Sequence, residues 1–144
     1  MGINIGTMGS NIKALTDWQS FWEKGLAYRK TARGMCAHRD KFNTAIVYNV
    51  LSMAVEGLFM GYFMAHGGLP ENHTLRDLVD YSHHYLELPL DVAAGLVRMD
   101  GIQQICSVDS FSIQALNWEE VEQFLVWTDT LETVLVKGMP EGMA

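Results

Sequence analysis

The longest apolar stretch of the chain constrains its fold more than any other feature. Residues 43–65 read NTAIVYNVLSMAVEGLFMGYFMA, and they show neither the alternation of a strand nor the single apolar stripe of a surface helix. We expect one helix over residues 39–65, about 40 Å long at a rise of 1.5 Å per residue. A helix that is apolar on every side must be surrounded by other helices or by lipid.

Three polar residues decide between these two environments. Asn49, Ser52 and Glu56 fall on one narrow face in the middle of the run. An ionised glutamate at the centre of a bilayer costs at least about 2.5 kcal/mol. We therefore interpret the segment as the central helix of a soluble, cytoplasmic bundle with no membrane partner. Gly57 and Gly61 form a GxxxG pair, which lets a neighbouring helix approach closely.

We expect four further helices around this one and no strand. Their start signals include Thr16-Asp17-Trp18-Gln19, Asn72 or Thr74, and Asn117. The expected ranges are 16–37, 72–88, 89–105 and 117–137. This pattern predicts an all-α fold, a four- to five-helix up-down antiparallel bundle.

Length and composition place that bundle in a single domain. A chain of 144 residues, 49% of them hydrophobic, can bury a core without disulfides or metals. We expect a flexible N-terminal tail over residues 1–15, one domain over 16–138 and a C-terminal tail over 139–144. The two cysteines, Cys36 and Cys106, match no zinc or redox spacing, which favours reduced thiols in the cytoplasm.

Charge is distributed unevenly along the chain. The formal net charge is −7, yet residues 1–41 hold seven of the ten Lys and Arg and only three of the seventeen Asp and Glu. An acidic protein with a basic first helix is a poor electrostatic match for general nucleic-acid binding. The same asymmetry favours self-association of a basic face with an acidic one, although such complementarity governs encounter rates more than partner choice.

The stretch NHTLRDLVDYSHHYLELP concentrates ionisable groups after a Gly-Gly-Leu-Pro break. On a helical projection the core stripe consists of Leu75, Leu78, Val79, Ser82 and Leu86. The opposite face carries Arg76, Asp80, His83, His84 and Glu87. A metal site from Asp80, His84 and Glu87 would face outward and lacks a second ligand motif on another helix, so we predict neither a metal nor a cofactor.

Two alternatives assign a ligand or an activity to charged residues. Arg76 and His83 lie two turns apart, so a metal-independent ribonuclease could use the arginine to stabilise a phosphate and the histidine to move a proton. A nucleotide could instead stack on Trp22 and pair with Arg29 and Arg33. The competing interpretation of the second set is packing, with the arginines paired to acids of another helix.

The chain also resembles a known helical family. The stretches concerned are WQSFWEKGLAYRKTA, AVEGLFMGYF, GGLPENHTLRDLV, which contains a Pro-x-x-His-x-Leu-x-x-Leu element, and LPLDVAAGLVRMDGIQ. Over about residues 16–138 this order is similar to HEPN domains, which occur in nucleotide-associated and toxin–antitoxin proteins. The resemblance implies a helical bundle that commonly dimerises.

The same resemblance implies that the usual ribonuclease motif is missing. HEPN ribonucleases carry Arg-x(4–6)-His after a turn that here matches Met99-Asp100-Gly101, which places Gln103 and Val108 at the two catalytic positions. Glutamine has no charge to offset a phosphorane, and valine has no proton to exchange. We therefore expect a homodimeric, non-catalytic binding or assembly module. The resemblance further implies a nucleotide or a nucleotidyltransferase as a candidate partner.

Overall fold

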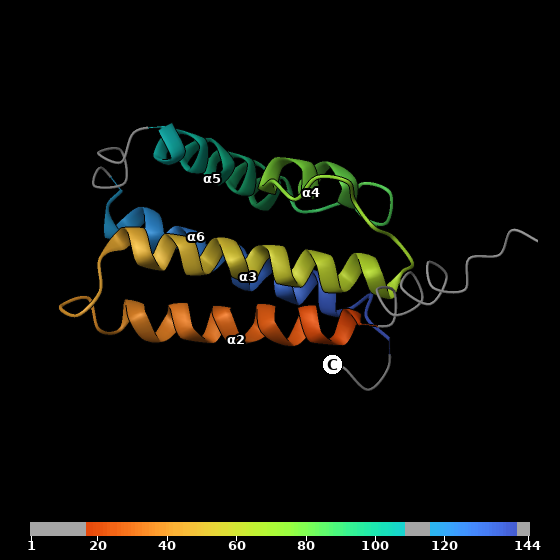
Figure 1. Cartoon of the computed structure of the whole chain (residues 1–144), viewed down its shortest axis with the longest axis horizontal. Helices are drawn as coiled ribbons and strands as arrows, with labels where there is room; N and C mark the ends of the chain where they lie inside the picture. The colour runs from red at the N-terminus through yellow and green to blue at the C-terminus, as the bar shows by residue number, and fades with distance from the viewer. Residues whose placement is uncertain (1–16, 109–115, 141–144) are drawn as a thin grey trace, which may run out of the picture.

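The computed structural model describes residues 17–108 and 116–140, and for residues 103–108 it describes the backbone alone. The five helices of these residues are α2 (Trp18–Cys36), α3 (Thr44–Ala65), α4 (Leu75–Ser82), α5 (Leu90–Val108) and α6 (Trp118–Val136). No strand occurs within these ranges, so the expected all-α bundle is confirmed for them (Figure 1). Thr16 and nearly all of both expected tails lie outside the described residues.

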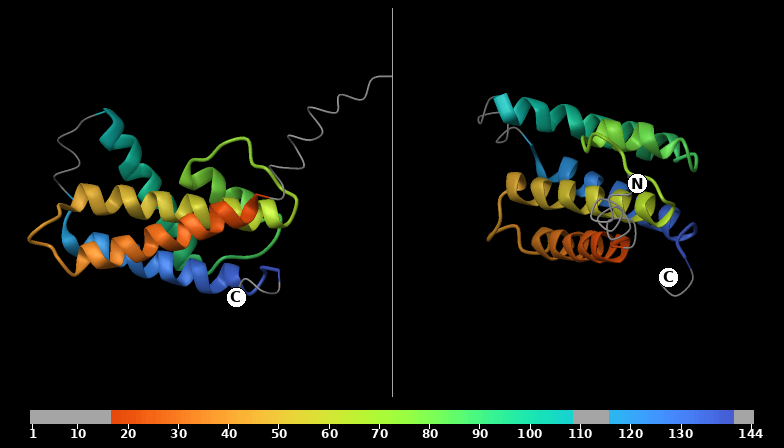
Figure 2. Two further views of the ribbon diagram at one scale, coloured as in Figure 1. Left: turned by 60° about the horizontal axis from the view of Figure 1, so that its bottom comes forward. Right: turned by 45° about the vertical axis from the view of Figure 1, so that its right-hand side comes forward.

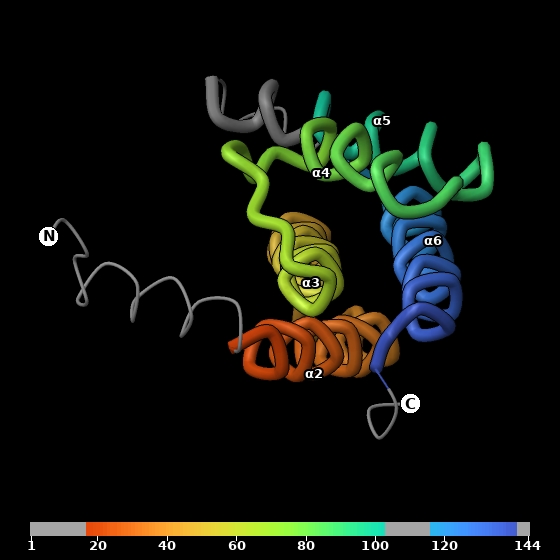
Figure 3. The backbone as a smooth tube through the Cα atoms, turned by 90° about the vertical axis from the view of Figure 1, so that its right-hand side faces the viewer, coloured from red at the N-terminus to blue at the C-terminus, as the bar shows by residue number. Residues whose placement is uncertain are grey.

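Helices α2, α4 and α6 all pack against α3. In Figure 1, α2 and α3 run in opposite directions, and so do α5 and α6. Helices α4 and α5 pack on each other and cover one side of the α3 and α6 pair, as both views of Figure 2 show. Along the bundle axis, α2, α4 and α6 occupy three sides of α3, and no described helix covers its fourth side (Figure 3).

Helix α3 is the centre of the core. Fourteen of its 22 residues are buried, among them Val47, Leu58 and Phe63. Within the described residues it is the one helix long and apolar enough to cross a membrane by length and composition. Of its apolar window, 72% is already buried against the rest of the protein, which is the property expected of the central helix of a bundle.

Helix α3 begins later than the sequence predicted. The expected start near Arg39 was wrong, because residues 37–41 form turns and the helix begins at Thr44. Asn43 has extended backbone angles, and its Oδ1 accepts a hydrogen bond from the backbone N–H of Ile46 at 2.9 Å. This side chain caps the first turn, which fixes the helix start at the next residue.

Helix α4 is shorter than the expected range 72–88. Thr74 caps it, as one of the two proposed caps, and its hydroxyl oxygen accepts from the Asp77 N–H at 3.1 Å. After Ser82 the backbone N–H groups of His83 and His84 donate to carbonyls three residues earlier, which tightens the chain into a turn. The histidine pair therefore follows the helix instead of extending it.

Helices α2 and α3 meet through glycines, as the GxxxG pair predicted. A Cβ placed on Gly57 would lie 2.9 Å from the Cα of Gly25 and from the carbonyl oxygen of Phe21. A Cβ on Gly61 would lie 2.8 Å from the backbone nitrogen of Trp22. The two backbones are therefore in direct contact, and a side chain at either position of α3 would separate them.

Candidate functional site

Arg76 and His83 do not share a sheltered site. Both side chains are exposed, Arg76 on the first turn of α4 and His83 just beyond its last residue. Leu75, Leu78, Val79 and Ser82 are buried on the opposite face, as the projection predicted. A catalytic pair placed on open surface would have no low-dielectric environment to strengthen its interactions with a phosphate. The ribonuclease alternative stays a prediction, testable as RNA cleavage that His83→Ala abolishes.

An open hollow lies beside these residues. Asp77, Asp80, Tyr81 and His84 line it together with residues 69–72, and its volume is about 510 Å³. Across the part of the chain with described side chains, no three His, Cys, Asp or Glu residues are grouped so that they could hold a metal ion. The hollow is therefore an acidic surface depression without a ligand set.

Aromatic packing fixes the position of this acidic surface. Tyr81 and Tyr85 pack edge-on and face-on against Phe63 of α3, with ring centroids 4.7 and 5.8 Å away. Burial is the main cause that raises the pKa of Tyr85 to about 12, and a hydrogen bond that its hydroxyl donates to Tyr81 is the second. Gly68 lies against both hydroxyls, where an added Cβ would approach to 2.2 Å. The cluster thus anchors α4 to the end of α3 and supports the fold.

Arg29 and Arg33 form a charge network with α6. The Nη1 of Arg29 lies 2.9 Å from Oδ1 of Asp129, and its Nε lies 2.7 Å from Oε2 of Glu132. Arg33 binds the other oxygen of Asp129. The two arginines of the proposed nucleotide site are therefore engaged by carboxylates of the same chain, as in the packing interpretation.

Trp22, the third residue of that set, belongs to the core. Its side chain is completely buried, and its backbone contacts Gly61 of α3. Its indole Nε1 has no hydrogen-bond partner among the described atoms. A base could stack on this ring only after α2 and α3 had separated, so the three residues are placed for packing in this conformation.

The positions matched to the ribonuclease motif lie in the last turns of α5. Gln103 and Val108 are helical in their backbone, and their side chains lie outside the described residues. Met99, which precedes them, is buried and accepts a 2.5 Å hydrogen bond from the Tyr48 hydroxyl through its carbonyl oxygen. The start of the motif segment is thus tied to α3.

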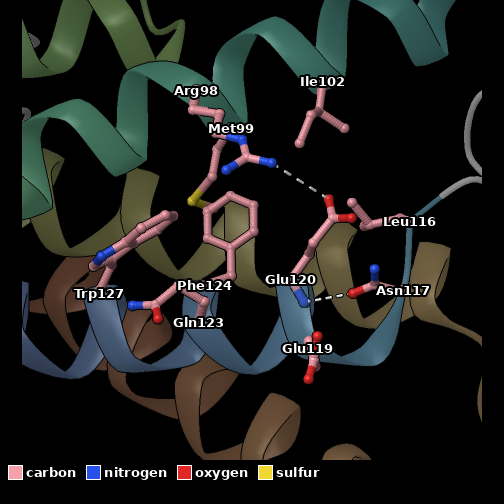
Figure 4. A pocket seen from close by; sticks show the side chains of 10 residues that line it. All are labelled: Arg98, Met99, Ile102, Leu116, Asn117, Glu119, Glu120, Gln123, Phe124 and Trp127. Carbon is pink, nitrogen blue, oxygen red and sulfur yellow. Dashed lines mark hydrogen bonds and ion pairs between the residues drawn. The ribbon is translucent and has the colours of Figure 1, made fainter.

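A cavity between α5 and α6 was not predicted from the sequence (Figure 4). Its volume is about 170 Å³. Its apolar lining comes from Met99, Ile102, Leu116, Phe124 and Trp127, and its polar lining from Arg98, Asn117, Glu119, Glu120 and Gln123. The only sequence signal was apolar and charged residues alternating at helical spacing on two separate helices, whose pairing the sequence does not specify.

A second feature is an apolar groove on the surface, formed by α3 and α2. Met53 of α3 is 45% exposed, and Ile46, two turns earlier, is 43% exposed. Phe21 and Tyr28 of α2 complete the apolar wall of a groove of about 180 Å³ beside Met53. Lys24 and Glu56 also line it, and Gly57 forms part of the floor. We call this set of groove residues together with Ile46 the α2/α3 face.

Comparisons with protein-family models, with curated proteins and with solved structures gave no match to this chain.

Proposed function

We propose that the protein is a non-catalytic assembly module of HEPN-like, up-down architecture that forms a homodimer through the α2/α3 face. One observation carries this proposal: α3 is the central helix of the core, yet Met53 and Ile46 on it are exposed in the described part of the chain. Burying these apolar side chains against a partner would remove them from water, which lowers the free energy and so favours association.

The spacing of the exposed groups suits a helical partner. Ile46, Met53 and the intervening Asn49 recur three to four residues apart along α3, which is the spacing of a helix-packing seam. Phe21 and Tyr28 of α2 add aromatic surface beside that seam. Aromatic residues and methionine are enriched at protein interfaces.

Charge complementarity favours a second copy of this chain as the occupant. In a two-fold interface the same surface patch faces itself. Lys24 of one protomer can then lie against Glu56 of the partner subunit, and the reverse pair forms at the same time. Within one chain, Glu56 has a weaker contact, with its Oε1 3.4 Å from Nδ1 of the exposed His73. The groove therefore offers both charges needed to pair with an identical groove.

The positions of the candidate catalytic and nucleotide-binding residues support a non-catalytic role. Arg76 and His83 are exposed, while Arg29 and Arg33 are held by carboxylates of α6. The proposed assembly partner beyond the homodimer, a nucleotidyltransferase or a nucleotide, rests on the resemblance to HEPN domains alone.

Replacing Met53 with glutamate should disrupt the dimer. Two-fold symmetry would bury the new charge twice at the interface, so the dissociation constant should rise at least about tenfold. Light scattering across a dilution series measures the effect directly. The wild type should change from dimer to monomer on dilution, and the variant should be monomeric at concentrations where the wild type is not.

Val126→Glu provides the matched control. Val126 is 54% exposed on α6, so the same type of change is made at a similar exposure away from the α2/α3 face. It should leave the dilution curve unchanged. A wild type that is monomeric at every concentration would contradict self-association and leave the face to a partner of different sequence.

A further inference from the structure

The cavity between α5 and α6 has the size of a site for one aromatic ring. Its volume is about 170 Å³. An engineered protein cavity of about 150 Å³ with an apolar lining binds benzene. Of the side chains that line the present cavity, Met99 is 1% exposed and Phe124 is 2% exposed. Its inner wall is therefore apolar, and the cavity is large enough for a six-membered ring.

The shape of the wall is fixed by close packing of the two helices. Trp127 of α6 lies over Gly95 of α5, where an added Cβ would approach the indole ring to 2.4 Å. The ring of Phe124 meets that of Trp127 edge-on, with centroids 6.2 Å apart. Because each ring is held by a neighbour, the aromatic wall exists before any ligand binds, and binding needs little ordering of the protein.

The polar side of the cavity is acidic. It carries Glu119 and Glu120 against a single arginine, Arg98, which gives these side chains a formal charge of −1. The whole chain is also negative, at −7. The charges of these side chains and the net charge of the chain both favour a cation over an anion at the cavity mouth.

Arg98 forms only a weak ion pair with the carboxylate of Glu120. Its Nη2 lies 3.9 Å from Oε2 of Glu120, the long end of the range for an ion pair, and its side chain is 67% exposed. The Glu120 side chain is 33% exposed. Such a pair is weak, so Arg98 can move toward solvent while Glu120 accepts a stronger donor from a ligand. In Figure 4 this pair spans the space between α5 and α6, next to Phe124.

We propose that this cavity binds a small organic cation, one aromatic ring carrying an ammonium group. The ring lies against Met99, Phe124 and Trp127, and the ammonium donates to Glu120 at the mouth. This site is separate from the α2/α3 face and does not depend on dimerisation.

Three ligands with the same ring and different charge test the assignment. Benzylamine, benzyl alcohol and phenylacetate are titrated into the full chain, and amide chemical shifts of residues around the cavity are followed by NMR. Benzylamine should bind most tightly, with shifts confined to α5 and α6, and phenylacetate least. Equal affinities for the three, tighter binding of phenylacetate, or no saturable shift at millimolar benzylamine would each overturn the proposal.

Two variants that each remove one negative charge distinguish binding to the Glu120 carboxylate from attraction by the net charge of the protein. Glu120→Gln should weaken benzylamine binding about fivefold and leave benzyl alcohol unchanged, because only the cation uses the carboxylate. Glu122→Gln removes the same charge two residues away, from a side chain that binds Arg39 and does not line the cavity. It should leave benzylamine affinity unchanged. An equal loss in both variants would show that only the net charge of the protein matters.

Discussion

Replacing Gly57 with leucine should prevent α2 from docking on α3. Even the Cβ of the new side chain would lie 2.9 Å from the backbone of α2, at Gly25 and Phe21. Backbone atoms cannot turn aside as a flexible side chain can, so the two helices must separate. Overpacking of a core commonly costs about 1 to 3 kcal/mol, and leucine adds three more carbons beyond the Cβ. We expect the free energy of unfolding to fall by at least ~3 kcal/mol.

Urea denaturation followed by far-UV circular dichroism measures this loss. All proteins are compared at one concentration, because dimerisation would otherwise change the apparent stability. Gly34 of α2 supplies the control, since nothing lies within 4 Å of a Cβ added there. Gly34→Ala should be neutral or stabilising by up to ~1 kcal/mol through helix propensity. A Gly57→Leu protein with wild-type stability would show that the α2 and α3 backbones are not in contact.

Removing the side chain of Leu58 should have the second largest effect. Leu58 is fully buried on α3, and its backbone nitrogen lies next to Gly25 of α2. Leu58→Ala removes its hydrophobic transfer energy and leaves a cavity, which together typically cost about 2 to 5 kcal/mol. Leu90→Ala makes the same chemical change at the first residue of α5, where the side chain is 89% exposed. That control should stay within about 0.5 kcal/mol of the wild type.

The two leucine variants are compared by thermal unfolding and by urea titration. Similar losses at both positions would contradict the burial pattern of α3. A large loss at Leu58 alone would support the placement of this helix at the centre of the core.

The presence of the helices and the side of each that faces the core could be predicted from the sequence. Both depend on the spacing of apolar residues along a short segment. The inward positions of α6 illustrate this, since its buried residues share one helical face: Val121, Phe124, Leu125, Thr128, Leu131 and Leu135. The close approach at Gly57 was also predictable, because a missing Cβ is visible in the sequence. The ends of the helices were harder to predict. Asn43 caps α3 because its backbone has extended angles, and those angles are visible only in the structure.

Pairing between helices could not be obtained in the same way. The acids that hold Arg29 lie 100 and 103 positions further along the chain, at Asp129 and Glu132. The sequence supplied charges of both signs but not the register that joins them. The cavity beside Trp127 could not be predicted for the same reason. Its walls come from α5 and α6, and neither helix has a sequence that indicates a cavity by itself. Sites made between elements require the tertiary arrangement.

The most direct test of self-association through the α2/α3 face is a charge exchange between two variants. Lys24→Glu and Glu56→Lys each place like charges opposite each other twice in a two-fold dimer, whereas a mixture of the two restores both opposite-charge pairs. Native mass spectrometry of each variant alone and of the mixture provides the measurement. The proposal predicts monomers for each variant alone and a heterodimer in the mixture. Homodimers of both variants, or a mixture that remains monomeric, would contradict it.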